Sequence, residues 1–304
     1  MSRPRYSVLA GERRLEVGER PLLMGVVNAS PDSFSDERSP HTLAGRLALA
    51  RAQVRAGADI VDVGGESART GRRAISPEHE IELVAPLVEA IAGELETVIS
   101  VDTYKPAVAA AAIGAGAGIV NDVSGLRDPE LAAVCARTGA ALVVMDTRAA
   151  PKERRQDPDL YREDVAGDVI EFLARRIETA LAAGVSFERL IVDPGPDFSK
   201  TPAQTIALLR ECRRLHELGR PLLMAISRKD FIGALTGRAP RGRQAGTLAA
   251  LAHGLQAEAH IFRVHDVAAA AEFIAVWEAL QGERAVSRDL ALAEELRSEP
   301  PSAA

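Results

Sequence analysis

The stretch RPLLMAISRKDFIGAL, residues 220–235, contains the unit from which the chain is built. An apolar run ends abruptly in the four polar residues SRKD, 227–230, and apolar residues resume directly after them. A short apolar run without alternation is typical of a strand that is buried on both faces, as in a parallel sheet. The polar residues then mark the carboxyl end of a strand, and a helix is expected to follow.

The same pattern recurs along the whole chain. Eight short apolar runs alternate with longer segments rich in Ala, Leu, Glu and Arg. Alternating strands and helices indicate parallel βαβ units, and eight such units are the number that closes a barrel. We therefore predict an α/β fold, a TIM (β/α)8 barrel in a single domain, with an open doubly wound sheet as the alternative. The predicted strands are LLMGVVN (22–28), DIVDVGG (59–65), TVISVD (97–102), GIVND (118–122), ALVVMD (141–146), LIVDPG (190–195), PLLMAIS (221–227) and HIFRVHD (260–266). The predicted helices include 41–56, 78–93, 128–138, 164–183, 201–218 and 267–280.

The composition agrees with this fold and excludes some functions. The chain has 304 residues, 47% of them hydrophobic but only 4% aromatic, which suits helices packed on a buried parallel sheet. A net charge of -6 gives no indication of binding to nucleic acid or to an anionic membrane. No apolar run approaches transmembrane length, and the N-terminus lacks the apolar core of a signal peptide. Because Cys135 and Cys212 show no metal-ligand spacing, we expect reduced thiols in a cytoplasmic protein.

The two ends of the chain differ from its middle. Residues 1–20 are predicted to form a small hairpin or extension at the bottom of the barrel, residues 21–282 the barrel, and residues 283–304 a polar, disordered tail.

Helix starts carry their own signals. Ser76-Pro77 and Thr201-Pro202 each place a hydroxyl at an expected N-cap and a proline in the first turn.

Polar residues stand at the end of every predicted strand. The carboxyl ends of the strands in a parallel barrel meet at one face, where active sites are found. Contact with water explains any one polar strand end, but not all eight, since the opposite strand ends are not similarly polar. The strand-end residues are Asn28, Asp62 with the following GGES, Asp102, Asn121 with Asp122, Asp146, Asp193, Ser227 with Arg228 and Lys229, and Arg263 with His265 and Asp266.

Some of these residues suggest a site for an anion. Arg263 and His265 are two apart on one predicted strand, so they point to the same face. With Lys229 on the neighbouring strand they would form a cationic pocket suited to a phosphate or pyrophosphate. Arg69 follows GGES directly above the barrel mouth, which favours a functional position for it as well.

Other strand ends suggest a site for a polar heterocycle and a metal. Asp102, Asn121 and Asp193 supply acceptors that could bind the donor edge of such a ring. Asn28 and the loop PDSFSD, residues 31–36, add oxygen ligands suited to Mg²⁺, which usually takes a few protein oxygens together with substrate phosphate.

Seven motifs in this chain resemble those of the dihydropteroate synthases. NASPDSFSD, GADIVDVGGESAR, ISVDTYKP, IVNDVSG, DPGPDFSKT, SRKDFIG with GTLAA, and IFRVHDV follow the order and spacing of that family, and the resemblance spans residues 20–280. It implies a TIM barrel, usually a homodimer. It also implies that the enzyme condenses 6-hydroxymethyl-7,8-dihydropterin pyrophosphate with p-aminobenzoate and releases pyrophosphate, with Mg²⁺ as cofactor.

The resemblance also implies roles for individual residues. The implied pterin ligands are Asp102, Asn121, Asp193 and Lys229; the implied pyrophosphate ligands are Asn28, Arg69, Arg263 and His265; and the implied second-substrate pocket is Ala68, Arg69, Thr70, Phe198 and Asp230. Asn28 would also hold the metal, and Asn28, Arg69, Lys229 and Arg263 would act in the reaction step. No side-chain nucleophile is required, because the pterin methylene would lose pyrophosphate to give a stabilised cation that the arylamine attacks.

The sequence departs from the family pattern mainly on the side of the second substrate. The family's SRKS is SRKD here, ending in Asp230, and GGESTRPG is GGESARTG, both on that side. DPGIGFGKT is DPGPDFSKT, which puts Pro196, Asp197 and Ser199 near the pterin pocket, and the MHM of strand 5 is MDT. If Asp230 faced the carboxylate of p-aminobenzoate at about 4 Å, the repulsion would cost roughly 4 kcal/mol. If Asp230 turned away, it would cap the following helix and leave its backbone N–H for the substrate.

These departures leave two alternatives to a synthase. One is an enzyme that transfers or hydrolyses a pterin pyrophosphate without p-aminobenzoate. The other is a protein that keeps the barrel and the pterin site but has no catalytic activity.

Overall fold

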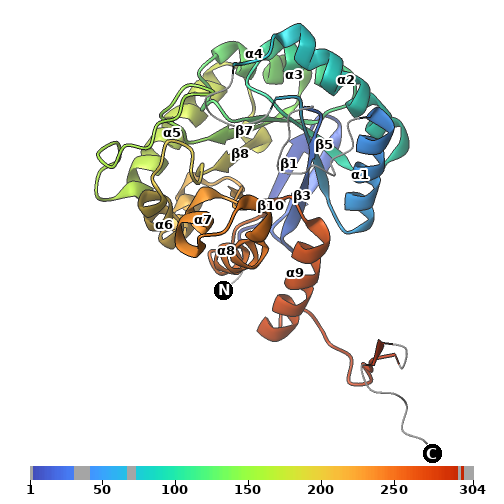
Figure 1. Ribbon diagram of the computed structural model, residues 1–304. Helices are drawn as coiled ribbons and strands as arrows, with labels where there is room; N and C mark the ends of the chain where they lie inside the picture. Colours follow the sequence, from blue (N-terminus) through green and yellow to red (C-terminus); the bar gives the residue numbers. More distant parts are fainter. Residues whose placement is uncertain (1–2, 31–41, 67–72, 294–295, 298–304) are drawn as a thin grey trace, which may run out of the picture.

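The chain folds as a parallel barrel with helices on its outside (Figure 1). The computed structural model describes residues 3–30, 42–66, 73–293, 296 and 297. Eight parallel strands form one sheet in the order β8-β7-β6-β5-β4-β3-β10-β9, and a parallel bridge between Val192 and Leu222 brings its two edges together. The predicted TIM barrel is therefore confirmed, and the open doubly wound sheet is excluded.

All eight predicted apolar runs contain a barrel strand. The strands are β3 (Leu22–Asn28), β4 (Ile60–Gly64), β5 (Val98–Asp102), β6 (Ile119–Asp122), β7 (Ala141–Met145), β8 (Leu190–Asp193), β9 (Leu223–Met224) and β10 (Ile261–Val264). Nearly every residue in them is buried, because helices cover the outer face of the sheet and side chains fill the barrel.

Helices connect the strands and form the outer ring (Figure 1). They are α1 (Leu43–Arg55), α2 (Pro77–Glu94), α3 (Pro106–Gly114), α4 (Pro129–Thr138), α5 (Val165–Ala182), α6 (Pro202–Arg210), α7 (Asp230–Thr236), α8 (Gln244–Gln256) and α9 (Val267–Gln281), with short 3₁₀ helices η1 (Phe187–Arg189), η2 (Cys212–Leu218) and η3 (Pro240–Gly242). Both predicted helix starts are confirmed: Ser76 Oγ accepts the N–H of His79, and Thr201 forms a capping box with Gln204. The single helix predicted for 201–218 was wrong, because the chain leaves α-helical geometry at Glu211 and continues as η2.

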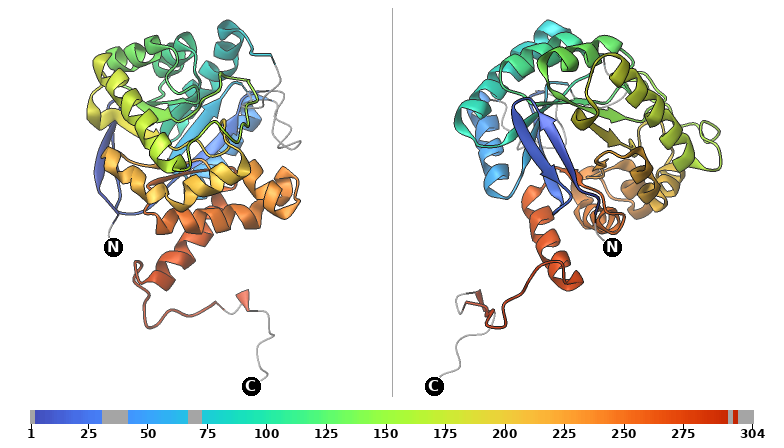
Figure 2. Two further views of the ribbon diagram at one scale, coloured as in Figure 1. Left: turned by 90° about the vertical axis from the view of Figure 1, so that its left-hand side faces the viewer. Right: turned by 180° about the vertical axis from the view of Figure 1, so that it is seen from behind.

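An N-terminal hairpin covers the amino-terminal end of the barrel. Strands β1 (Tyr6–Ala10) and β2 (Arg13–Val17) pair in antiparallel register, and their apolar side chains pack on residues that begin the barrel strands, such as Ile119 and Ile261. Figure 2 shows the hairpin lying across this end of the barrel in the view from behind. The opposite end, where the strands terminate, is therefore the one available to a ligand.

The C-terminal residues leave the barrel after α9. Gly282 ends this helix in a left-handed conformation, and the described residues from 283 onward are exposed and lie away from the barrel (Figure 1). The predicted disorder of residues 283–304 falls partly outside the described residues and stays a prediction. No helix within the described part of the chain is both long and apolar enough to cross a membrane.

Candidate active site

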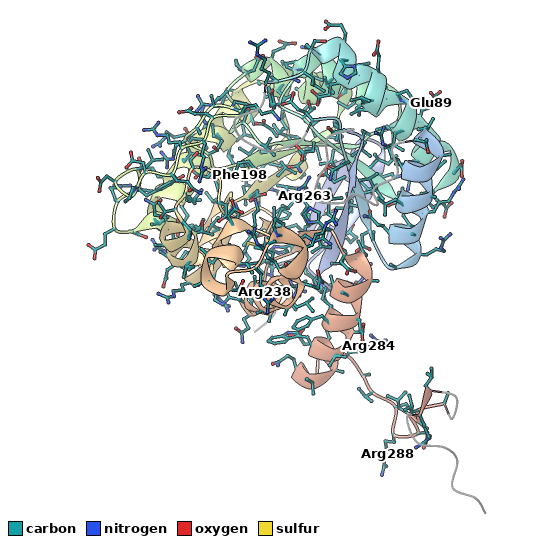
Figure 3. All side chains as sticks on the ribbon, in the orientation of Figure 1. Glu89, Phe198, Arg238, Arg263, Arg284 and Arg288 are labelled. Atoms are coloured by element: carbon teal, nitrogen blue, oxygen red, sulfur yellow. The ribbon has the colours of Figure 1, made fainter. Side chains whose placement is uncertain are left out.

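The carboxyl ends of the strands surround a cavity of about 590 Å³. Figure 3 shows Arg263 near the middle of the ring of strands and Phe198 to one side of it. The structure brings most of the predicted site residues to this one cavity. Those that line it are Asn28, Asp102, Asn121, Asp193, Phe198, Lys229, Asp230, Arg263 and His265.

Arg263 links two carboxylates in the middle of the site. Its Nε donates to Asp62 Oδ2 at 2.6 Å, and its Nη2 donates to Asp102 Oδ2 at 2.7 Å. Asn121 Nδ2 also donates to Asp62 Oδ2, at 3.2 Å. Burial lowers the pKa of Arg263, but the two carboxylates outweigh it and raise the pKa above its ordinary value, so the guanidinium stays charged.

Asp62 is a site residue to which the sequence assigned no role. It is fully buried within β4, below the cavity floor, and it holds both Arg263 and Asn121. A buried aspartate inside an apolar strand was the available signal, because such a carboxylate is rarely buried unless it is paired. Its partner lies 201 residues away in the sequence, so the pairing itself could not be predicted.

Two of the carboxyl groups in the cavity titrate close to neutral pH. Burial raises the pKa of Asp102 to about 7, although Arg263 opposes the shift. Burial also raises the pKa of Asp193 to about 6, although the N–H of Gly195 donates to its Oδ1 at 2.7 Å and Lys229 is nearby. Each group is therefore partly protonated near neutral pH while the cavity is empty, and hydrogen bonds donated by a ligand would favour its ionised form.

The cationic character of the pocket comes from fewer groups than the sequence suggested. Burial, reinforced by Arg228, Arg263 and Lys229, lowers the pKa of His265 to about 3, so this imidazole is neutral. Its Nδ1 is hydrogen-bonded to Ser227 Oγ at 3.0 Å. His265 therefore offers a hydrogen bond, and the charge is carried by its cationic neighbours.

Lys229 lies at the junction of β9 and α7. Its Nζ is 4.4 Å from the centre of the Phe198 ring, a cation–π contact between the two neighbouring loops. Burial lowers the pKa of Lys229, while Asp197 and Asp193 oppose that shift.

Asp230 lines the cavity at its exposed rim. Its side chain is 72% exposed at the rim and accepts a hydrogen bond from Arg243 Nη1 at 2.8 Å. The alternative in which Asp230 caps α7 was wrong, because Asp230 is the first residue of that helix and Lys229 is the N-cap. The backbone N–H of Asp230 is not left for a substrate either, since it donates to the carboxylate of Asp197.

The loop predicted to carry Arg69 lies largely outside the described residues. Ala68, Arg69 and Thr70, like the loop 31–36, lie outside the described residues. Glu66, at the described edge of that segment, accepts from Lys105 at 2.7 Å and pairs with Lys152 at 2.7 Å. This carboxylate thereby connects the loops that follow β4, β5 and β7.

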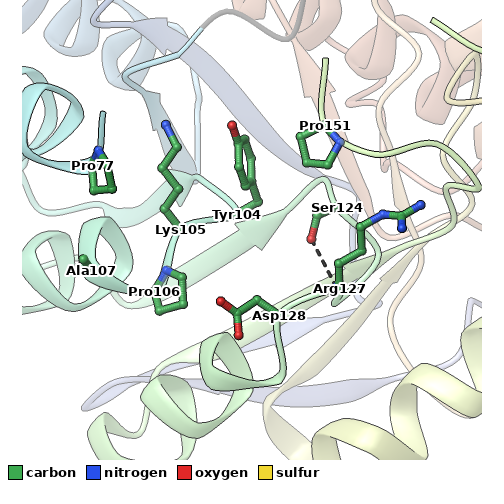
Figure 4. A pocket seen from close by; sticks show the side chains of 9 residues that line it. All are labelled: Pro77, Tyr104, Lys105, Pro106, Ala107, Ser124, Arg127, Asp128 and Pro151. Carbon is green, nitrogen blue, oxygen red and sulfur yellow. Dashed lines mark hydrogen bonds between the residues drawn. The ribbon is translucent and has the colours of Figure 1, made fainter. Parts of the chain in front are cut away.

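A second, smaller cavity of about 330 Å³ (Figure 4) shares two lining residues with the main one. Tyr104 and Pro151 line both cavities and form part of the wall between them. The remaining lining includes Pro77, Pro106 and Arg127, and Arg127 donates to backbone carbonyls of the β7–α5 loop. The smaller cavity is therefore mostly an apolar space between loops.

The described residues offer only a limited site for a metal ion. Asn28 is half-buried at the end of β3 and lines the main cavity. No group of three or more His, Cys, Asp or Glu side chains within the described ranges could hold a metal. The oxygen of Asn28 suits Mg²⁺, which keeps several waters and uses phosphate oxygens of its substrate.

A parallel barrel with facing carboxylates, an amide and cations at its mouth is the architecture of an enzyme that binds a polar ring carrying an anionic group. Residues 24–265 match the family described as pterin binding enzymes, which covers the barrel almost completely.

Individual relatives narrow the assignment further. The chain is 38% identical over 272 residues to the dihydropteroate synthase of Synechocystis sp., covering 89% of this chain and 93% of that protein. It is 38% identical over 259 residues to the Escherichia coli dihydropteroate synthase, covering 85% of this chain and 91% of that protein. The chain belongs to the dihydropteroate synthase family of pterin-binding enzymes.

Solved structures agree with this assignment. Xanthomonas albilineans dihydropteroate synthase with 4-aminobenzoic acid superposes with a TM-score of 0.82 at 40% identity, covering 92% of this chain and 99% of that one. The same enzyme in complex with 7,8-dihydropteroate gives a TM-score of 0.79 at 39% identity, covering 91% and 99%.

Proposed function

We propose that this protein condenses 6-hydroxymethyl-7,8-dihydropterin pyrophosphate with p-aminobenzoate, forming dihydropteroate and pyrophosphate in folate biosynthesis. The observation that carries the proposal is the cluster in which Arg263 joins Asp62 and Asp102 at the floor of one cavity, beside Asn121 and Asp193. The relatives support this assignment over a paralogue without p-aminobenzoate, since their identity of 38% extends over most of both chains. Release of pyrophosphate that depends on p-aminobenzoate tests the proposal directly.

The acceptor groups in the cavity would hold the pterin. The carboxylates of Asp102 and Asp193 and the side-chain amide of Asn121 would bind the donor edge of the ring. Lys229 would donate to an acceptor on the same ring. Asp62 would act through Arg263 and Asn121, fixing the direction in which both present their hydrogen bonds.

The cationic groups would hold the pyrophosphate and stabilise its departure. Arg263 and neutral His265 would donate to it, and Arg69, which lies outside the described residues, would close the site. Negative charge develops on the leaving group as its bond to the pterin methylene breaks, and a fixed guanidinium stabilises that charge. Asn28 would help to hold Mg²⁺, which when bound would neutralise part of the same charge.

The arylamine would attack the pterin methylene cation, which the departure of pyrophosphate leaves, from the side of Phe198. The aromatic ring of Phe198 lies against Lys229 and lines the cavity, so it offers a flat apolar face to the benzene ring of the acceptor. Ala68 and Thr70, also predicted for this pocket, lie outside the described residues.

Further proposals concern the oligomeric state, the cellular location and the ligands of the enzyme. We propose a homodimer, supported by large exposed apolar side chains on α9, Val276 at 56% and Leu280 at 79% exposure. A cytoplasmic location is supported by two free, buried cysteines, Cys135 and Cys212. The net charge of -6 supports small-molecule substrates without nucleic acid.

The raised pKa of Asp193 predicts that the pterin binds more tightly as the pH rises. Only the ionised carboxylate is a pure acceptor for the N–H donors of the ring, and the pKa of this group is about 6. We expect the pterin Kd to fall from about pH 5 to about pH 8, and the Asp193→Asn variant to lose the part of this dependence centred near pH 6 while it keeps the part near pH 7 that Asp102 contributes. Calorimetric titration over that range measures it. A Kd of the unmodified protein that is independent of pH would contradict the role of Asp193.

The same raised pKa values make the free protein less stable as the pH rises, although the same rise in pH makes pterin binding tighter. The unfolded chain releases these protons near pH 4, whereas folded Asp102 and Asp193 keep theirs until about 7 and about 6. The folded state therefore binds more protons in between. The contribution of these two groups to the stability of the free protein falls as the pH rises through this window.

Replacing Asp230 with serine is expected to change the KM for p-aminobenzoate by less than about threefold. The carboxylate is 72% exposed and already paired with Arg243, so solvent and the guanidinium screen its effect on a bound carboxylate. Initial rates at saturating pterin pyrophosphate measure the effect. A KM that fell by about tenfold or more would restore the idea that Asp230 repels the substrate.

A further inference from the structure

The segment between β8 and α6 has an unusual backbone. Asp197 and Ser199 have positive φ angles of 65° and 55°, a conformation that non-glycine residues seldom adopt. Side-chain hydrogen bonds hold both residues there. Ser199 Oγ accepts the N–H of Arg148 at 3.0 Å and that of Ala149 at 2.7 Å, which fastens the start of the β7–α5 loop to this segment.

The carboxylate of Asp197 is fixed from two sides. On one side, Thr205 Oγ1 donates to Asp197 Oδ1 at 3.2 Å and accepts the N–H of Asp197 at 3.1 Å. On the other side, Asp197 Oδ2 accepts the backbone N–H of Asp230 and, at 3.4 Å, that of Phe231. These bonds connect the segment to the first residues of α7 and leave the carboxylate little freedom to move.

Asp197 also lines the main cavity, on the side of Phe198 and Lys229. The nearby guanidinium of Arg243 is already used, since its Nη1 donates to Asp230 and to the carbonyl oxygens of Arg228 and Lys229 at 2.8 and 3.1 Å. Asp197 therefore places a fixed negative charge, partly offset by Lys229, in the wall of the cavity where the arylamine is expected, and it occupies backbone donors that an anion could otherwise use.

We propose that Asp197 determines the specificity for the second substrate: its carboxylate disfavours an arylamine that carries a carboxylate relative to a neutral arylamine of the same shape. This inference rests on the proposed function of the same site. The inference predicts that the charge of Asp197 weakens the binding of p-aminobenzoate. Removing that charge should therefore increase the preference of the enzyme for p-aminobenzoate over the neutral arylamine.

The Asp197→Asn variant tests this with little change in shape. Its amide oxygen would still accept from the N–H of Asp230, and its NH₂ group would donate to Thr205. The readout is the ratio of kcat/KM for p-aminobenzoate to that for p-aminobenzamide, at saturating pterin pyrophosphate. We expect the ratio to rise at least about tenfold, through a lower KM for p-aminobenzoate, while the KM for the amide stays within about threefold.

Asp164→Asn is the matched control. Asp164 also accepts a backbone N–H at a helix start, from Gly167 at 2.9 Å, but it pairs with Arg214 and does not line the cavity. Its variant should leave the ratio unchanged. An unchanged ratio in Asp197→Asn, or an equal loss for both arylamines, would overturn the inference and leave Asp197 a purely structural role.

The activity of the unmodified protein distinguishes failure of the proposed function from failure of the inference about Asp197. If it turned over neither arylamine, the proposed function would be contradicted. Equilibrium binding of the same two arylamines, with pterin and pyrophosphate present, would then decide the inference. A shift of the affinity ratio of at least about tenfold in Asp197→Asn supports it, and an unchanged ratio overturns it.

Discussion

Replacing Arg263 with methionine is expected to lower the free energy of unfolding by about 3–5 kcal/mol, and kcat/KM by at least about a thousandfold. Methionine keeps much of the side-chain volume but removes the charge that joins Asp62 and Asp102. Two neighbouring carboxyl groups would then share a buried site without a counterion. Binding of the pterin and departure of the pyrophosphate would both suffer, because each depends on the geometry that Arg263 fixes.

Denaturant unfolding followed by circular dichroism measures the loss of stability. Arg51→Met is the matched control, because Arg51 pairs with Glu94 on the surface, where both side chains are about 40% exposed. Its removal should cost less than about 1 kcal/mol. A similarly small cost for Arg263→Met would show that the Asp62–Arg263–Asp102 cluster does not organise the site.

Replacing Lys200 with methionine is expected to cost about 3–5 kcal/mol of stability as well. Lys200 and Asp146 are both fully buried, and Lys200 Nζ donates to Asp146 Oδ1 at 2.6 Å. The same ammonium donates to the carbonyl of Gly195 at 3.0 Å and that of Phe198 at 3.3 Å, so it holds the segment that carries Asp197. We therefore also expect a higher KM for the arylamine.

A second substitution separates charge from packing in this pair. Lys200→Met leaves the buried Asp146 carboxylate with one cationic partner, Arg148, whose Nε lies 3.3 Å from Asp146 Oδ2. Adding Asp146→Asn removes this incompletely compensated charge, so the double variant should be more stable than Lys200→Met alone. The hydroxyl of Tyr161, which donates to Asp146 Oδ1 at 2.7 Å, can still donate to the asparagine oxygen. A double variant less stable than either single variant would contradict a charge-based account of this pair.

The fold could be predicted because its signals are local. A run such as 221–226 identifies a buried strand without reference to the rest of the chain, and the polar residues after it identify the end that faces ligands. The serine and threonine that begin α2 and α6 are equally local signals. Collecting the strand ends was therefore sufficient to bring most of the site residues together.

The parts of the site that could not be predicted depend on contacts between distant segments. Asp197 binds a backbone donor 33 residues away, and this contact uses the N–H of Asp230 that the sequence alternative left for a substrate. His265 is neutral because of burial and cationic neighbours that only the folded barrel brings near. Asp62 lies below the cavity, where a strand-end pattern gives no indication of what it holds.

The most direct test of the central claim is pyrophosphate release by the purified protein, supplied with 6-hydroxymethyl-7,8-dihydropterin pyrophosphate and Mg²⁺, with and without p-aminobenzoate. The account predicts release that depends on p-aminobenzoate, with dihydropteroate formed in equal amount. Release that is independent of p-aminobenzoate, or no release while the pterin still binds, would contradict it.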